Sequence, residues 1–304
     1  MAERIVWEGE LVARRGLYAR GAALLAGGMG FIALLLALPS LALVALAFAT
    51  RGTYGDVVWS FSLDQMKRLA GYGILGWSPD LLWILARSVA VAGVTTALCI
   101  LLAFPLAFFV ASRPPSRRYL WLALVVVPML TNLVIRTYGW FPILGTHSPL
   151  TALARGAGLL NADESLYPGA LAVYLGMVSG SLPFAVLPLY AAAERLDGSL
   201  VDAARDLYGG RWLVFRHAIL PQVRVGLAVA TILTFVPALG AFVIPDLLGG
   251  ARYMLMGNLI QQQFFAARNW PFGAAVSLAL LGCSLCGLFL YWRAQLKDEQ
   301  GARA

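Results

Sequence analysis

Residues 199–221 carry the residue types that a docking element for another protein needs. Ser199 followed by Asp202 is a capping-box pattern, so a helix is expected to begin at Leu200. One apolar stripe at helical spacing follows: Leu200, Ala203, Ala204 and Leu207. Because its alanines are small, this stripe would let the surface of another protein approach closely.

A turn and a second short helix are expected to complete a helical hairpin. Gly209 or Gly210 can supply the left-handed residue that ends the first helix. The second helix is expected to end at Pro221. Its apolar side holds Trp212, Phe215 and Ile219. An amphipathic hairpin that only connects two membrane segments would show the same pattern, so the residues alone leave both interpretations open.

Residues that could support catalysis or bind a metal lack the necessary spacing. A phosphate-binding P-loop needs Gly-Lys-Ser/Thr, and neither lysine of the chain, Lys67 or Lys297, follows a glycine. His147 and His217 lie in separate segments, outside any Ser/His/Asp arrangement. The three cysteines lie within apolar runs: Cys99, Cys283 and Cys286. We therefore expect no catalytic residue, cofactor or metal in this chain.

The elements that position these residues are expected to lie in a membrane. Hydrophobic residues make up 60% and charged residues 12% of the 304 residues, against about 45–50% and about 25% in soluble domains. A transmembrane helix needs about 20 apolar residues. Six runs without Asp, Glu, Lys or Arg qualify: 21–50, 88–112, 119–135, 165–193, 225–245 and 269–292. The first run is expected to be a retained span, because it lacks an early cleavage motif.

Two of these runs have ambiguous ends. The third is expected to continue past Arg136 to Trp140, whereas 137–154, with two prolines and two glycines, is expected to form a loop. The fifth contains residues that loosen or end a helix: Pro237, Gly240, Pro245, Gly249 and Gly250. Irregular backbone at membrane depth is tolerated only where protein or a water-filled cavity surrounds it. A helix end packed on its neighbours or a span that lines a translocation path fits this pattern, and we favour the path.

Basic residues are distributed unevenly about the spans. Fifteen of the 23 lie in the N-terminal tail, the 113–118 turn, the 194–224 segment and the C-terminus, and six lie in the intervening segments. Because basic residues favour the cytoplasm, both termini and the hairpin are expected there. Arginines spread between apolar runs do not indicate a nucleic-acid partner. The expected organisation is a cytoplasmic tail at 1–20, a first transmembrane helix at 21–50, an outer loop at 51–83, a transmembrane domain at 84–292 that includes the hairpin 199–221, and a cytoplasmic tail at 293–304.

The hairpin resembles the cytoplasmic EAA loop of ABC importer permeases, in which Glu-Ala-Ala is followed by Gly, a hydrophobic residue and Leu-Pro. The matching residues are Asp202, Ala203, Ala204, Gly209, Phe215, Leu220 and Pro221. Asp202 stands where the family usually has Glu, and Tyr208 stands where it usually has its Gly. In the family this loop forms the coupling helix that inserts into a cleft on the ATPase subunit. The resemblance therefore implies ATPase coupling for these residues, together with Leu207 of the stripe.

Further motifs resemble the spermidine/putrescine branch of these permeases over residues 84–292. They are Asn132–Trp140, Ser181–Phe184 through Ala193–Arg195, Gly240–Gly250, Gln261–Phe264 and Asn269–Gly273. The resemblance implies an all-α type I ABC importer permease with six transmembrane helices and a cytoplasmic coupling helix, in the inner membrane of a bacterium. It also implies partners: a second permease subunit, an ATPase dimer that binds ATP and Mg, and an extracytoplasmic solute-binding protein.

The substrate that this resemblance implies is a polyamine such as putrescine or spermidine. Carboxylates and aromatic faces are the groups that would hold such a polycation. Asp246 is the one acid attached to the fifth-span motif. The aromatic candidates for the substrate path are Trp140, Tyr138, Tyr174 and Phe242. Arg136 argues mildly against a cationic substrate, because an unpaired cation would repel it.

Other functions remain open. Related permeases in this branch handle ferric iron, thiamine or aminoethylphosphonate. An ion-coupled secondary transporter would need ionisable residues within its spans, and nearly all six runs are free of them. A purely structural membrane subunit would not need the hairpin.

Overall fold

The structure, a computed structural model of the chain, describes residues 8–53, 55–73, 76–161, 164–250 and 253–301. The long helices are α1 (Glu8–Ala47), α3 (Asp80–Ala111), α8 (Ala170–Glu194), α11 (Leu220–Leu239) and α14 (Trp270–Gly301). Among the described residues, five apolar helices are long enough to cross a membrane, and one bent pair of helical segments makes a sixth span. The predicted all-α membrane fold is therefore confirmed.

The third span is the bent one. It begins with α4 (Pro115–Val126) and the 3₁₀ turn η1 (Val127–Leu130), and it continues, after a bend of 95°, through α5 (Leu133–Tyr138) and α6 (Trp140–Leu144). The span continues past Arg136 as predicted, but the sequence analysis did not predict the bend.

The reason for the bend lies in two residues. Pro128, in η1, lacks the backbone donor that a continuous helix would use. Asn132 then starts a new helix, because its Oδ1 accepts a hydrogen bond from the Val134 N–H at 2.8 Å. The predicted loop at 137–154 was wrong, since α6 and α7 (Pro149–Gly156) occupy most of it.

Helices α3, α8 and α11 pack on one another and form the centre of the molecule. Mostly small side chains fill the contact: Cys99, Ala103, Ala107, Ala185, Val186, Leu189 and Ala230. Small residues let helix backbones approach closely, which favours helix association in lipid. The approach is tight at Gly226 of α11, where a Cβ atom would lie 2.5 Å from the Cβ of Ala192 and 2.8 Å from the Pro188 carbonyl oxygen.

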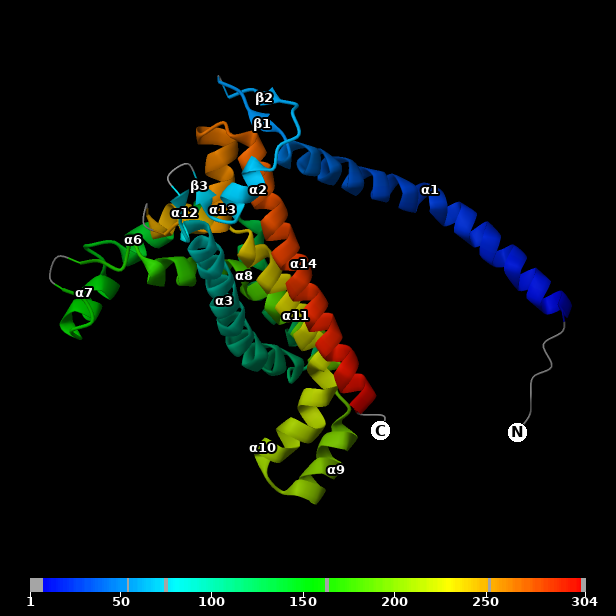
Figure 1. Cartoon of the computed structure of the whole chain (residues 1–304). Helices are drawn as coiled ribbons and strands as arrows, with labels where there is room; N and C mark the ends of the chain where they lie inside the picture. Colours follow the sequence, from blue (N-terminus) through cyan, green and yellow to red (C-terminus); the bar gives the residue numbers. More distant parts are fainter. Residues whose placement is uncertain (1–7, 54, 74–75, 162–163, 251–252, 302–304) are drawn as a thin grey trace.

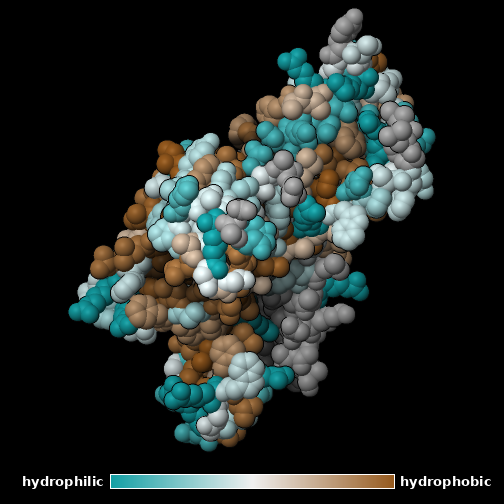
Figure 2. All heavy atoms as spheres, turned by 90° about the vertical axis from the view of Figure 1, so that its left-hand side faces the viewer, coloured by the Kyte–Doolittle hydropathy of each residue, from teal (hydrophilic) through white to brown (hydrophobic). Residues whose placement is uncertain are grey.

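Helices α1 and α14 lie outside this centre. Ala47, at the end of α1, is buried with Ala274 and Ala275 of α14. The rest of α1 extends away from the other helices (Figure 1), and its side chains from residue 26 to residue 42 are exposed. Figure 2 shows apolar side chains over much of the middle of the molecule, as expected for a surface that faces lipid.

The two ends of the molecule carry different elements (Figure 1). At the upper end lie the antiparallel pairs β1 (Thr50–Arg51) with β2 (Val57–Val58) and β3 (Tyr72–Gly73) with β4 (Gly76–Trp77), and the helical segments α2 (Asp64–Leu69), α12 (Val243–Gly249), α13 (Met256–Gln261) and η3 (Gln262–Ala266). At the lower end lies the hairpin of α9 (Gly198–Tyr208) and α10 (Arg211–Val214), which the π-helical segment η2 (Phe215–Ile219) joins to α11. The hairpin and the β-strands therefore lie on opposite sides of the apolar layer.

The packing at Gly226 predicts the effect of adding one methyl group. Gly226→Ala should force α8 and α11 apart and lower the free energy of unfolding by about 1–3 kcal/mol. Gly282→Ala in α14 is the matched control, because nothing lies within 4 Å of its added Cβ. The free energy of unfolding of both variants can be measured in mixed micelles, with tryptophan fluorescence reporting the loss of tertiary structure. Equal stability of Gly226→Ala and wild type would show that the helices are not closely packed there.

Candidate functional site

The hairpin begins at an aspartate cap. The Asp197 carboxylate accepts hydrogen bonds from the Ser199 N–H at 2.9 Å and from the Ser199 hydroxyl at 2.7 Å. These bonds, the hydroxyl first, hold the pKa of Asp197 below its ordinary value. The predicted cap at Ser199 and helix start at Leu200 were wrong, because Asp197 has the extended backbone of an N-cap and α9 already begins at Gly198. Asp202 instead pairs with Arg205 at 2.7 Å.

The turn of the hairpin depends on Gly209. This residue has φ +63°, the left-handed conformation that the sequence predicted for Gly209 or Gly210, and its N–H donates to the Arg205 carbonyl at 2.9 Å. A side chain at this φ would be strained. Gly209 therefore sets the direction in which the second limb leaves the first.

The second limb does not end at Pro221. Helix α10, the π-helical segment η2 and α11 continue from Arg211 to Leu239 as one helical rod. The predicted helix end was wrong because Pro221 lies in the first turn of α11, directly after the π-helical segment, whose wider turns accommodate a residue without a backbone N–H. Leu220 is half-buried and Pro221 is exposed.

The apolar residues of the hairpin separate into an inner and an outer set. The inner set is buried between the two limbs: Val201, Ala204, Val214 and Ala218. The outer set is exposed: Leu200, Ala203, Leu207 and Trp212. Leu207 is 78% exposed and Trp212 is 69% exposed. The hairpin thus has a core that fixes its shape and an outer apolar face with no covering within the described chain.

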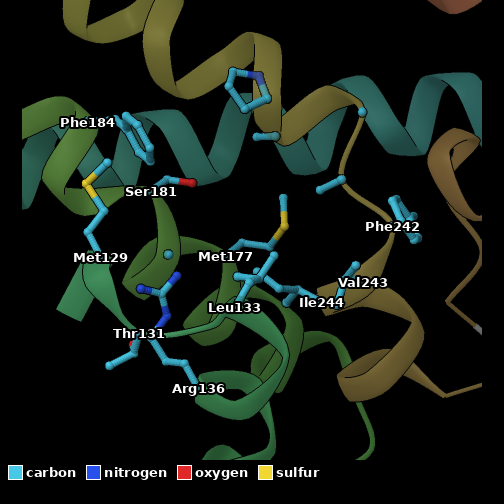
Figure 3. Close-up of a pocket in the computed structure, with 15 residues that line it drawn as sticks. Met129, Thr131, Leu133, Arg136, Met177, Ser181, Phe184, Phe242, Val243 and Ile244 are labelled. Atoms are coloured by element: carbon cyan, nitrogen blue, oxygen red, sulfur yellow. The ribbon is translucent and has the colours of Figure 1, made fainter.

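A second candidate site is a cavity of about 460 Å³ between α5, α8 and the end of α11 (Figure 3). It lies where the two broken spans meet: at the bend of the third span and at the end of the fifth, which stops at Leu239 before α12. Its lining is Met129, Thr131, Leu133, Arg136, Met177, Gly180, Ser181, Phe184, Pro237, Ala238, Gly240, Ala241, Phe242, Val243 and Ile244. Figure 3 places Met129 and Phe184 on one side of the cavity and Phe242 on the other.

Arg136 is the one charged residue among these lining residues. Its Nη1 donates to the Pro128 carbonyl at 2.6 Å, and the Thr131 hydroxyl donates to the same carbonyl at 2.7 Å. The guanidinium lies beside Gly180 of α8, where a Cβ atom would be 3.5 Å from Nη2. Arg136 therefore stabilises the bend of the third span and also places a positive charge at the cavity.

The structure brings only one of the five predicted path residues to this cavity. Phe242 lines it, whereas Asp246 is exposed outside it. Trp140 and Tyr174 pack against a buried cluster at the upper end, and Tyr138 is exposed with its ring edge on Phe141.

Tyr174 also has a polar partner away from the cavity. It lies beside Tyr253, whose pKa is raised to about 12, first by burial and then by the neighbouring Tyr174 side chain. The guanidinium of Arg87 lies 5.8 Å from the centre of the Tyr253 ring. Tyr174 therefore belongs to a packed network at the upper end.

Sequence reasoning missed two groups of site residues. Ser181 and Met177 of α8 line the cavity, but neither the apolar run nor the family motif that includes Ser181 shows which of its residues face a cavity. Trp212 was predicted to lie on the apolar side of the hairpin, but its exposure to solvent was not predicted. The bend at Thr131 had a signal, since a polar pair, Thr131 and Asn132, follows Pro128 in an apolar run. Among the described residues, no three His, Cys, Asp or Glu side chains lie close enough to hold a metal ion.

Comparisons with known proteins agree with this architecture. Residues 12–295 match the family described as binding-protein-dependent transport system inner membrane component. The chain is 36% identical to the spermidine/putrescine transport system permease protein PotB of Haemophilus influenzae, over 84% of this chain and 87% of that protein. It is also 36% identical to PotB of Escherichia coli, over 88% of this chain and 94% of that protein.

A solved structure has the same fold. It is the crystal structure of a bacterial ABC transporter involved in the import of the acidic polysaccharide alginate, and it matches with a TM-score of 0.65 over 94% of this chain and 97% of that chain. The sequence identity is 15%, so this likeness concerns the fold alone. The family match and the identity to PotB carry the assignment: the chain belongs to the binding-protein-dependent transport system inner membrane components and is a permease subunit of an ABC importer.

Proposed function

We propose that this chain forms half of the translocation path of a polyamine importer and couples it to an ATPase through residues 199–221. The observation that carries the proposal is the 36% identity to PotB permeases over most of the chain, joined to a hairpin whose outer apolar face is uncovered. The other half of the path comes from a second permease subunit. An extracytoplasmic binding protein delivers the solute at the upper end.

The hairpin is the site of ATPase docking. Ala203 and Leu207, with Asp202 beside them, present the surface, while Ala204 and Gly209 hold its shape. Phe215, Leu220 and Pro221 connect this surface to α11. ATP and Mg bind to the partner ATPase, and this chain acts as a transport subunit.

Docking on an ATPase requires a cytoplasmic hairpin. The described end of α14 lies toward the hairpin side of the molecule (Figure 1), so the C-terminus is then cytoplasmic too, and six spans would return the N-terminus to the same side. The excess of basic residues in these segments supports the same orientation. The elements β1 to β4 and α2 would face the extracytoplasmic side.

The rod from Arg211 to Leu239 provides the mechanical path. It starts in the hairpin and ends at Pro237 and Ala238, which line the cavity. Closure of the ATPase pair on ATP would displace the hairpin, and the rod would move the cavity wall with it. The cavity would thereby open alternately toward each side of the membrane.

A path that selects polyamines needs negatively charged groups, and the described cavity lining of this chain contains none. None of the lining residues in the described chain is a carboxylate, and Arg136 is a cation. We infer that the partner permease supplies the carboxylates at the cavity, that Asp246 attracts the polycation from outside it, and that Phe242 offers an aromatic face. Trp140, Tyr138 and Tyr174 then support the outer wall of the path.

The first prediction concerns docking. Leu207→Glu should leave the fold intact, because Leu207 is 78% exposed. It should raise the dissociation constant for the ATPase at least about tenfold, because a carboxylate would be buried without a partner. Co-purification and binding titrations with the ATPase measure this effect. Leu159→Glu, equally exposed in the segment between α7 and α8, is the matched control. Unchanged ATPase binding by Leu207→Glu would contradict the docking role and the cytoplasmic orientation.

The second prediction concerns the substrate. Vesicles that hold the complete complex should take up labelled putrescine and spermidine. Asp246→Asn should slow this uptake by up to about fivefold at low ionic strength, since an exposed charge contributes roughly 0–1 kcal/mol. The difference should vanish at high salt, because screening shortens the reach of an exposed charge. Uptake of an anionic or neutral solute, with neither polyamine transported, would contradict the polyamine assignment and leave the permease assignment standing.

A further inference from the structure

A row of aromatic rings connects the outer face of the hairpin to a helix that is remote in sequence. The exposed Trp212 stacks on Phe215 with ring centroids 5.5 Å apart. Phe215 meets Phe104 of α3 edge-on at 5.6 Å, with 74° between the ring planes. Phe104 in turn stacks on Phe108 at 4.7 Å. Helices α8 and α11 are joined to the hairpin through the chain, whereas α3 meets it only through side chains.

The hairpin can transmit a displacement because it is braced as a unit. Its limbs bury a common core of four apolar residues, Val201, Ala204, Val214 and Ala218. Gln222 of α11 also ties the base together, because its Oε1 accepts from the Asp197 N–H at 2.9 Å and its Nε2 donates to the Ala218 carbonyl at 2.9 Å. A partner that pushes on the outer face would therefore move Phe215 with the rest of the hairpin.

Phe104, where the row of rings meets α3, lies next to a position at which this helix can bend. Phe104 packs against the central cluster that α3 shares with α8 and α11. The next residue, Pro105, lies inside α3 and removes the hydrogen bond that a backbone N–H would make to the Leu101 carbonyl. Figure 1 shows α3 curving toward its lower end. The ring contact therefore acts on α3 beside the turn that lacks this hydrogen bond.

We propose that Phe104 is a positioning residue for coupling: it receives the motion of the hairpin through Phe215 and passes it to α3. The inference rests on the proposed docking of the hairpin on an ATPase, and it adds a route into the transmembrane bundle besides the rod of α10 and α11. With this route, all three central helices follow the hairpin. Without it, the hairpin would act on α3 only indirectly, through the packing of α3 on α8 and α11.

The experiment compares coupling with assembly in the complete complex, reconstituted with the ATPase, the partner permease and the binding protein loaded with spermidine. Phe104→Ala should retain ATPase association and basal ATP hydrolysis. It should lower the stimulation of hydrolysis by the loaded binding protein by about threefold to tenfold, the factor that corresponds to the loss of one ring pair. Phe104→Tyr, which keeps the ring, should restore the stimulation. Phe109→Ala is the matched control, because its ring contacts Trp121 and Arg113 and lies outside the row.

A double-mutant cycle then separates transmission from packing. Phe104→Ala combined with Phe215→Ala should be no worse than the more severe single variant, since both remove the same contact. Wild-type stimulation in Phe104→Ala, or additive losses in the double variant, would overturn the inference. An equal loss in Phe109→Ala, or basal hydrolysis that falls in parallel with stimulation, would also overturn it. A wild-type permease that fails to bind the ATPase would instead refute the proposed function.

Discussion

Backbone N–H and C=O groups within the apolar layer of a membrane need hydrogen-bond partners inside the protein, and this constraint governs where the chain can break its helices. Two spans are broken beside the cavity, and each break has its own compensation. At the third span, Arg136 and Thr131 both donate to the Pro128 carbonyl. At the fifth span, the Asn258 amide donates to the Phe242 carbonyl at 2.9 Å. These side chains satisfy backbone carbonyls where the two spans leave the helical path beside the cavity.

The same chain segment links this cavity to the hairpin. From Arg211 to Leu239 the backbone is helical, with a π-helical segment at the membrane end of the hairpin, and π-helical segments are frequent at functional sites. Close packing at Gly226 ties this rod to α8. With the hairpin at one end and a cavity wall at the other, one element would serve both the proposed docking and access to the cavity, which is the arrangement a coupled transporter requires.

The sequence predicted whatever depends on composition and local geometry. Charge-free runs located the six spans, and the glycine pair located the left-handed turn at Gly209. It did not predict the bend after Pro128, because residue type alone does not show that the side chains of Thr131 and Arg136 turn back to the Pro128 carbonyl. It also could not tell which side of a broken helix faces the cavity. Asp246 was therefore predicted as a path residue from its type, although it lies outside the cavity, whereas Ser181, part of a family motif, was not predicted to line the cavity.

The most direct test of the account is site-specific photo-cross-linking of the hairpin in native membranes. A benzoylphenylalanine residue at position 207 should cross-link to the ATPase subunit, and the yield should change when ATP binds, because the hairpin moves with the ATPase pair. The same photoreactive residue at position 159, in the segment between α7 and α8, should give no such product. A cross-link to the ATPase from position 159 and none from position 207 would contradict the central claim that this chain couples to its ATPase through the hairpin.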